Sequence, residues 1–453
     1  MTDHVLAAAP ALPSHELLVF LLQVAVLLLG AFALGRLAQR LGLPAIVGEL
    51  LTGVVIGPSV LGHALPDLSA WFLPSTGEQQ HLLDATCQIG VLLLVGVTGT
   101  HLDAAMLRRR GGSALTISIC GLAIPLVLGL AAGTLMPAGL IGDGTPRWVF
   151  ALFLGTAMSV SAIPVIAKTL SDMRLLHRDI GQLVLAAGTV DDAIGWFLLS
   201  VVSAAATVGV TAARVTAGVA YLIGFIALAV LIGRPLVRRA LSLAARSPEA
   251  GPSTAVAVVL ILLGGALTQA LGMEPVFGAF IAGILVGLPG AGDQRKLAPL
   301  RTVVMSVLAP LFIASAGLRM DLSELRRPSI ALAALAVLAI AVIGKFAGAY
   351  LGARLTGLRS WEALALGAGM NARGVVEVVV ATTGLRLGVL TTATYTVVVL
   401  VAVVTSLMAP PLLRLAMNHV EQNERETVRH AMHDAWSAAG SEPGDPARNV
   451  SST

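Results

Sequence analysis

The chain has 453 residues, of which 56% are hydrophobic and only 12% charged, and its mean hydropathy of +0.88 exceeds what a soluble core can bury. The net charge of +4 does not indicate a nucleic-acid partner, because the basic residues are scattered through short loops between apolar segments. These segments run to about twenty residues, which excludes the short alternating strands of a barrel and predicts an all-α polytopic protein in a lipid bilayer.

Residues 1–15 precede the first apolar segment. They have neither the basic start nor the cleavage site of a signal peptide, so we expect a short extracytoplasmic N-terminus and a first helix that is retained. Breaks at charged or Pro/Gly-rich positions then predict about thirteen membrane-spanning helices. We expect them to begin near residues 16, 44, 82, 112, 147, 180, 214, 254, 273, 297, 328, 361 and 392.

The loop charges predict an orientation. If the N-terminus is outside, the inner loops carry about seventeen Lys and Arg residues, Arg178 and Lys296 among them, and the outer loops about six, Arg319 and Arg386 among them. Because basic loops stay on the cytoplasmic side, this predicts a cytoplasmic C-terminal tail, residues 416–453.

The chain also repeats itself. GELLTGVVIG (48–57) and GAFIAGILVG (278–287) share three glycines in one register, and GTHLDAAMLRR (99–109) matches GLRMDLSELRR (317–327) in the same way. Within a transmembrane domain at 16–415, we therefore predict two six-helix repeats, about 16–207 and 254–415, joined by a linker helix at about 214–236. Because the linker crosses the membrane once, the second repeat begins on the opposite side from the first and is inverted relative to it. Inverted repeats are typical of secondary transporters.

The fifth helix of each predicted repeat has residues that interrupt a helix. GTAMSVSAIPVIAKTL (155–170) contains Ser159, Ser161 and Pro164, and GAGMNARGVVEVVVATTG (367–384) contains Asn371, Arg373 and Glu377. Broken helices at matching positions mark a transporter's ion site, since unwound carbonyls and half-helix ends can coordinate a cation. A simple proline kink in the first segment, and an Arg373–Glu377 pair four residues apart in the second, are the structural alternatives.

Two adjacent acids, Asp191 and Asp192, lie inside the sixth span. Each charge would cost roughly 2.5–3.5 kcal/mol at a helix centre if unpaired, so a partner is expected. Lys345 in the eleventh span lies at a similar depth, and successive helical residues point about 100° apart, so one aspartate can face Lys345 while the other faces a cavity. The alternative is a purely structural ion pair.

These segments together resemble the second monovalent cation:proton antiporter family, which includes bacterial sodium/proton and potassium/proton exchangers and plant cation/proton exchangers. The resemblance covers about residues 16–415 and rests on five stretches in the family's order, with the paired aspartates. The stretches are LPAIVGELLTGVVIGPSVLG, PVFGAFIAGILVG, PLFIASAGLRMDL, MNARGVVEVVVATTG and TSLMAPPLLR.

The resemblance implies a sodium/proton antiporter-like fold with two crossed, broken helices and a homodimer. It implies that Asp191 and Asp192 form the site for a monovalent metal cation, with Asp192 as the ligand for which cation and proton compete and Asp191 paired with Lys345. It further implies exchange of cytoplasmic sodium or potassium for external protons in the plasma membrane (the bacterial inner membrane). The Asp-Asp-Lys set is typical of electrogenic relatives that move two protons per sodium ion.

Several readings stay open. Sodium and potassium are not distinguished, and a potassium efflux channel of the same fold or a cation sensor are alternatives, although the short tail does not predict a nucleotide-binding or output domain. An aspartyl protease is disfavoured because adjacent aspartates on one helix point in different directions. Cys87 and Cys120 lie in different apolar segments, so we expect no disulfide framework and no cofactor beyond the transported ions.

Overall fold

The computed structural model describes residues 13–73, 77–100, 104–173, 175, 178–208, 220–221, 223–288, 293–421 and 426. Over these residues the chain is helical, and the one β-type contact is an isolated antiparallel bridge between Ile141 and Leu390. The all-α prediction is therefore confirmed for this part of the chain. Residues 1–12, 209–219, 222 and 427–453, which include most of the predicted N-terminus, the start of the linker helix and most of the tail, lie outside it.

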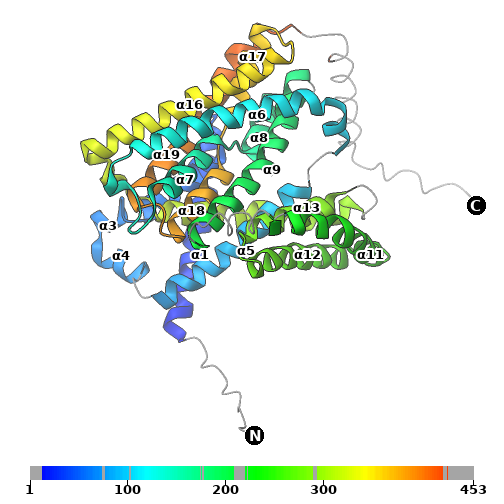
Figure 1. Cartoon of the computed structure of the whole chain (residues 1–453). Helices are drawn as coiled ribbons and strands as arrows, with labels where there is room; N and C mark the ends of the chain where they lie inside the picture. The colour runs from blue at the N-terminus through cyan, green and yellow to red at the C-terminus, as the bar shows by residue number, and fades with distance from the viewer. Residues whose placement is uncertain are drawn as a thin grey trace, which may run out of the picture.

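Figure 1 shows the helices in chain order. In the first half they are α1 (Ser14–Arg40), α2 (Ala45–Ile56), α3 (Leu61–Ala64), α4 (Pro66–Phe72), α5 (Gly77–Thr100), α6 (Ala104–Leu135), η1 (Ala138–Leu140), α7 (Arg147–Ser159), α8 (Ile163–Asp172) and α9 (Asp179–Val208). In the second half they are η2 (Ala229–Gly233), α11 (Arg234–Ala244), α12 (Gly251–Ala270), α13 (Pro275–Gly287), η3 (Gln294–Leu297), α14 (Ala298–Val303), η4 (Val304–Leu308), α15 (Ala309–Leu318), η5 (Leu322–Arg326), α16 (Pro328–Leu355), α17 (Ser360–Met370), α18 (Val375–Arg386) and α19 (Thr392–Met417).

Nine helical segments of the described chain are long and apolar enough to cross a membrane, and a tenth is added if α17 and α18 count as one span bent by 44°. The helices α7 and α13 are apolar but shorter. The protein is thus a multi-pass membrane protein. The number thirteen remains a prediction, since the seventh predicted start, near residue 214, falls outside the described residues.

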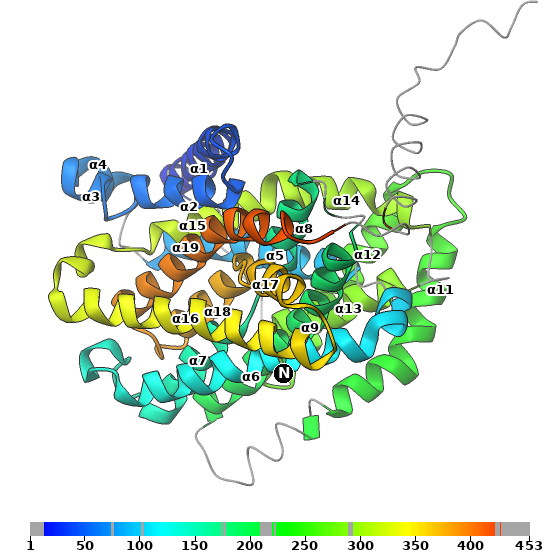
Figure 2. The same cartoon turned by 90° about the horizontal axis from the view of Figure 1, so that it is seen from above.

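The helices form two groups. In one, α6 runs beside α16 and packs on α7 and α9, while α17 and α18 pack on α19 (Figure 2). We call α6–α9 and α16–α19 the core bundle. In the other, α1 packs on α2, α2 on α15, and α13 on both α5 and α12; we call α1, α2, α5, α12, α13 and α15 the panel. The two groups touch where α9 meets α13 and where α18 meets α15.

The two glycine motifs make equivalent close contacts in the panel. A Cβ atom at Gly48 would overlap the backbone of the preceding helix α1, and one at Gly278 would overlap that of the preceding helix α12. Farther along each motif, Gly53 lies against α15, whereas Gly283 lies against α5. Small residues allow this backbone approach, which stabilises helix pairs in lipid by van der Waals contact. Each motif therefore joins its own preceding helix to a helix of the other half of the chain.

Helix α16 illustrates why these segments fold as they do in a membrane. It begins with Pro328 at its first position, where the missing N–H is not needed, and it ends just before Gly357, which has a φ of 87°. Its exposed side is leucine-rich, with Leu332 and Leu335 more than 60% exposed. Its opposite side carries small residues that pack on α6. This arrangement, apolar outside and small inside, brings the one lysine of the helix into the core bundle.

Candidate ion site

The two predicted interruptions are present, and they meet. Helix α7 ends at Ser159 and α8 begins at Ile163; α17 ends at Met370 and α18 begins at Val375. The backbone N–H of Ala162 in the first break donates to the carbonyl oxygen of Ala372 in the second, at 3.1 Å. Four half-helix ends, with backbone groups that a continuous helix would pair internally, therefore converge inside the core bundle.

Arg373 occupies the second break and caps the end of α7. Its guanidinium donates to the carbonyl oxygens of Ala157 (2.8 Å), Met158 and Ala341 (3.1 Å), and it is fully buried. A cation at the carboxyl end of a helix stabilises the partial negative charge there. Arg373 also lies 3.6 Å from Glu377, one turn along α18. The pairing with Glu377 and the capping of another helix therefore coexist.

Asp191 is held by a dense set of partners. It forms an ion pair with Lys345, and both side chains are fully buried. Ser118 of α6 donates to Oδ1 at 2.6 Å, and Ser161 in the first break lies 2.8 Å from Oδ2. Ser161 also lies 2.7 Å from the carbonyl oxygen of Met370, so its single proton serves one of the two acceptors at a time.

Lys345 links this carboxylate to the first break. Its ammonium group donates to the carbonyl oxygen of Ser159, the last residue of α7, at 2.5 Å. The lysine reaches this position because Gly344 and Gly348 lie against the α6 backbone at Pro125 and Cys120. One ammonium group thus neutralises a carboxylate and a half-helix carbonyl end together.

Asp192 has different surroundings. It is fully buried, yet neither of its carboxylate oxygens has a hydrogen-bond partner within the part of the chain that the structure describes. The two neighbouring aspartates therefore have separate roles in the structure: Asp191 is paired, and Asp192 is left with free acceptor oxygens.

The charges around the breaks do not balance. In the described residues there, the buried carboxylates of Asp191, Asp192 and Glu377 face two buried cations, Lys345 and Arg373. If all five are ionised, one negative charge remains. Because an uncompensated buried charge is expensive, this site favours one further positive charge, whether a proton or a metal cation.

Other polar atoms at the breaks also lack partners in the described chain. They include the amide nitrogen and the amide oxygen of Asn371, and the hydroxyl oxygen of Thr156 in the last turns of α7. A hard monovalent cation prefers oxygen ligands of this kind. Together with unwound carbonyls, they supply oxygens from both broken helices.

The structure brings most of the sequence-predicted site residues together. Ser159, Ser161, Asn371, Arg373 and Glu377 lie at or next to the breaks. Pro164 does not kink the middle of a helix: it is the second residue of α8, where its missing N–H costs little, so the break is a true interruption.

Two residues of the network were missed from sequence, Ser118 and Ser406. Ser118 binds Asp191, and Ser406 of α19 donates to the carbonyl oxygen of Arg373. A serine within an apolar span was the available signal, but many such serines bond only their own helix.

Crossed broken helices around buried charges define a class of membrane transport proteins, and the chain matches one family within it. Residues 24–418 match the family described as sodium/hydrogen exchanger, transmembrane, and the chain belongs to this family.

The most similar relatives include "Na(+)/H(+) antiporter NhaS4" of Synechocystis, which is 30% identical over 88% of this chain and 97% of its own length. "Na(+)/H(+)-K(+) antiporter GerN" of Bacillus cereus is 29% identical over 87% of this chain and 95% of its own length. "Cation/H(+) antiporter 17" of Arabidopsis thaliana is 29% identical over 88% of this chain, but the chain spans only 48% of that protein.

The fold resembles that of the sodium proton antiporter MjNhaP1 from Methanocaldococcus jannaschii, with a TM-score of 0.66 over 89% of this chain and 99% of that one. At 17% sequence identity, this likeness supports the fold alone.

Proposed function

We propose that the protein is a secondary active monovalent cation:proton antiporter that exchanges cytoplasmic sodium or potassium for external protons by alternating access. One observation carries the proposal: Asp192 is a fully buried carboxylate with unpaired oxygens, beside a second carboxylate that already has its counter-ion. A single group that takes either a proton or a cation couples the two fluxes, since the two cannot occupy it together.

The charge count supports the same exchange. The one unbalanced negative charge at the breaks is neutralised equally well by a proton on Asp192 or by a bound cation. A proton on Asp192 then allows the core bundle to move past the apolar panel without exposing a net charge to it, and so does a bound cation while Lys345 keeps its proton. The empty, ionised form is held back by its charge, which prevents uncoupled leakage.

The further ligands of the cation come from the breaks in this proposal. Asp191 lies beside Asp192, while Ser159, Ser161 and Asn371 supply oxygens from the two unwound segments, and Arg373 and Glu377 hold the half-helix ends in place. The printed names of relatives, which include Na(+)/H(+) and K(+)/H(+) antiporters, favour sodium or potassium as the cation.

We propose electrogenic exchange with two protons per cation. A second proton requires a second group, and the Asp191–Lys345 pair supplies one: when the cation binds Asp191, Lys345 is released from its counter-ion and can give up a proton. The cation-bound form then carries one net negative charge and the form with both protons carries none, so one charge crosses the membrane in each cycle. When a cation binds Asp191, the ammonium group of Lys345 keeps only its hydrogen bond to the carbonyl oxygen of Ser159. The charged form of Lys345 then loses the carboxylate that stabilises it most.

The thirteen spans, the inverted repeat and the orientation belong to the same proposal. The glycine contacts support the repeat, because each motif packs on its own preceding helix and on the third span of the other half. Three polar contacts support the topology, since each joins residues predicted on one side: Arg319 with Asp84, Arg386 with Glu274, and Lys296 with the carbonyls of Ala245 and Ser247. We further propose a homodimer formed through the panel in a bacterial inner membrane.

Proteoliposomes that contain a pH-sensitive dye test the function. Acid-loaded vesicles receive pulses of sodium, lithium or potassium, and we expect the wild-type protein to release lumenal protons with at least one of them. Asp192→Asn should abolish this response, while Asp143→Asn, which removes an exposed loop carboxylate, should retain it. No response to any cation between pH 6 and 9 by folded wild-type protein would contradict the proposal, and cation flux without proton movement would indicate a channel.

A further inference from the structure

A row of polar groups continues from Asp192 along one face of α9. Trp196 and Ser200 follow at intervals of four residues, and Ser203 continues the same face; each is less than 5% exposed. Residues four apart lie above one another on a helix, so these side chains form a single stripe. Ser200 lies eight residues from Asp192, about 12 Å farther along the helix axis. We call Asp192, Trp196, Ser200 and Ser203 the α9 stripe.

Two members of the stripe have polar atoms that are buried but unused. Neither the indole Nε1 of Trp196 nor the hydroxyl oxygen of Ser200 has a hydrogen-bond partner among the described residues. Hydroxyls on membrane helices ordinarily bond the carbonyl one turn back, as Thr189 of the same helix does with Leu185 at 2.8 Å. Ser200 makes no such bond, so its hydroxyl is not serving its own helix.

This arrangement is unfavourable in a permanently dry interface. A buried polar group without a partner costs about 1–3 kcal/mol, and the neighbouring Leu199 and Val202, equally buried, are apolar. A leucine or alanine at position 200 would avoid the cost. Polar groups at successive turns of one face are instead favourable if that face is wet in another conformation.

The stripe lies where the core bundle meets the panel. The ring of Trp196 packs on Phe280 of α13, with the ring centroids 6.3 Å apart and the planes tilted by 46°. Helix α13 belongs to the panel, and α9 carries the ion site. Movement of the core bundle against the panel would therefore separate these two rings and open the stripe from Ser200 back to Asp192.

We infer that the α9 stripe is the ion path between Asp192 and the side of the membrane on which α9 ends, and that the Trp196–Phe280 contact closes it. The inference rests on the proposed function and adds the route and the gate. In the open conformation, water hydrates the hydroxyls of Ser200 and Ser203, and a partly hydrated cation or a proton passes them to reach Asp192. In the conformation described here, the two rings exclude water.

Cysteine accessibility tests this path. Cys87 and Cys120 are replaced by serine and alanine to give a parent without thiols, and Ser200→Cys and Val202→Cys are made in it. Val202 is the matched control, because it is two residues away and equally buried but points about 160° from Ser200 on the helix. A membrane-impermeant, positively charged methanethiosulfonate is added from each side of oriented vesicles, and exchange is measured in the same preparation.

We expect the reagent to modify Ser200→Cys at least tenfold faster than Val202→Cys, from the side on which α9 ends and not from the other, and the modified protein to lose exchange. Phe280→Cys, on the opposite wall of the path, gives a second position if Ser200→Cys does not fold, and it should react from the same side. Equal rates at the stripe and the control, or reaction from the opposite side, in a parent that exchanges ions would overturn the path while leaving the proposed function intact. A folded parent that exchanges no cation for protons would overturn the proposed function and the path with it.

Discussion

Asp191 and Asp192 are adjacent in sequence but differ in what surrounds them. Asp191 forms an ion pair with Lys345 and accepts hydrogen bonds from Ser118 and Ser161, whereas both carboxylate oxygens of Asp192 are unpaired within the described chain. The 100° turn between successive residues predicted this separation and the pairing with Lys345. It could not predict which polar side chains of other helices complete the network, because that depends on packing distances which a single sequence does not contain.

The two aspartates should respond oppositely to neutralisation. Asp191→Asn leaves the buried Lys345 without its counter-ion, and breaking a buried pair in this way costs about 3–5 kcal/mol. Asp192→Asn removes an unpaired buried charge and should leave stability unchanged or raise it. Thermal unfolding of both variants in detergent at neutral pH measures the difference.

A double variant provides the control for this prediction. Asp191→Asn combined with Lys345→Met removes both charges of the pair, and we expect it to recover most of the stability lost in Asp191→Asn, without exchange activity. Equal melting temperatures for Asp191→Asn and Asp192→Asn would show that the ion pair does not distinguish the two positions.

At the scale of single elements, the glycine motifs and the broken helices have different origins. The breaks were predictable because Pro164, Asn371 and Gly374 are poor residues for a continuous apolar helix. The partners of the glycines were not predictable: the repeat identified Gly53 and Gly283 as equivalent, but only the structure locates α15 and α5 against them. Contacts between distant helices depend on how the whole chain is folded, whereas a helix interruption is a local property.

Enlarging Gly283 should separate α13 from α5. The backbone of Gly96 lies where a side chain at position 283 would be, so Gly283→Val should destabilise the protein by about 1–3 kcal/mol, because neither backbone can move aside cheaply. Gly251→Val is the control, since position 251 has open space around it at the start of α12. The melting temperature in detergent, together with the yield of monodisperse protein, measures the effect; a smaller loss for Gly283→Val than for Gly251→Val would be inconsistent with close packing here.

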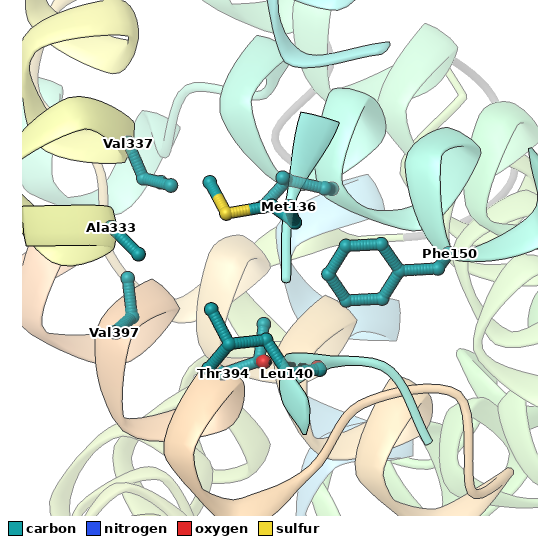
Figure 3. A pocket seen from close by; sticks show the side chains of 8 residues that line it. Met136, Leu140, Phe150, Ala333, Val337, Thr394 and Val397 are labelled. Atoms are coloured by element: carbon teal, nitrogen blue, oxygen red, sulfur yellow. Dashed lines mark hydrogen bonds between the residues drawn. The ribbon is translucent and has the colours of Figure 1, made fainter. Parts of the chain in front are cut away.

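At the scale of the whole molecule, the core bundle and the panel are joined by few polar contacts. One of them pairs Arg386 at the end of α18 with the buried Glu274, which precedes α13, at 2.7 Å. In another, the hydroxyl of Tyr395 on α19 donates to the carbonyl oxygen of Ala316 on α15 at 2.7 Å. Away from the ion site, a small pocket is lined mainly by apolar residues, among them Met136, Phe150, Val337 and Val397 (Figure 3). This pocket has no charged group with which to bind an ion.

The Glu274–Arg386 pair should hold the described conformation closed. A movement of α18 relative to α13 breaks it, so Glu274→Gln should favour the alternative conformation. An ion pair with one exposed partner contributes about 0.2–1 kcal/mol, which corresponds to a shift of up to about fivefold in the population ratio. Labelling of Ser200→Cys should accelerate by that factor in the Glu274→Gln background. An unchanged labelling rate would show that the Glu274–Arg386 pair does not hold the described conformation closed.

The all-α, multi-pass character and most helix starts could be predicted from the sequence because apolar length and helix-breaking residues are properties of local segments. Of the thirteen helix starts predicted near residues 16 to 392, eleven fall within five residues of the start of a helix in the structure. The predicted start near 112 is later than that of its helix, which begins at Ala104, and the predicted start near 214 lies outside the described residues. The division into core bundle and panel did not follow from these properties. It depends on which helix faces match, and apolar faces of similar composition give no unique answer.

The measurement that tests the central claim most directly is calorimetric titration of the purified protein with sodium and with potassium at several pH values, for wild type and Asp192→Asn. If cation and proton compete for Asp192, each cation bound must release at least one proton, and the apparent dissociation constant must rise at least tenfold for each unit by which the pH is lowered in the acidic range. We predict both effects in the wild-type protein and neither in Asp192→Asn. Cation binding that is independent of pH, or that is unchanged by Asp192→Asn, would contradict the account.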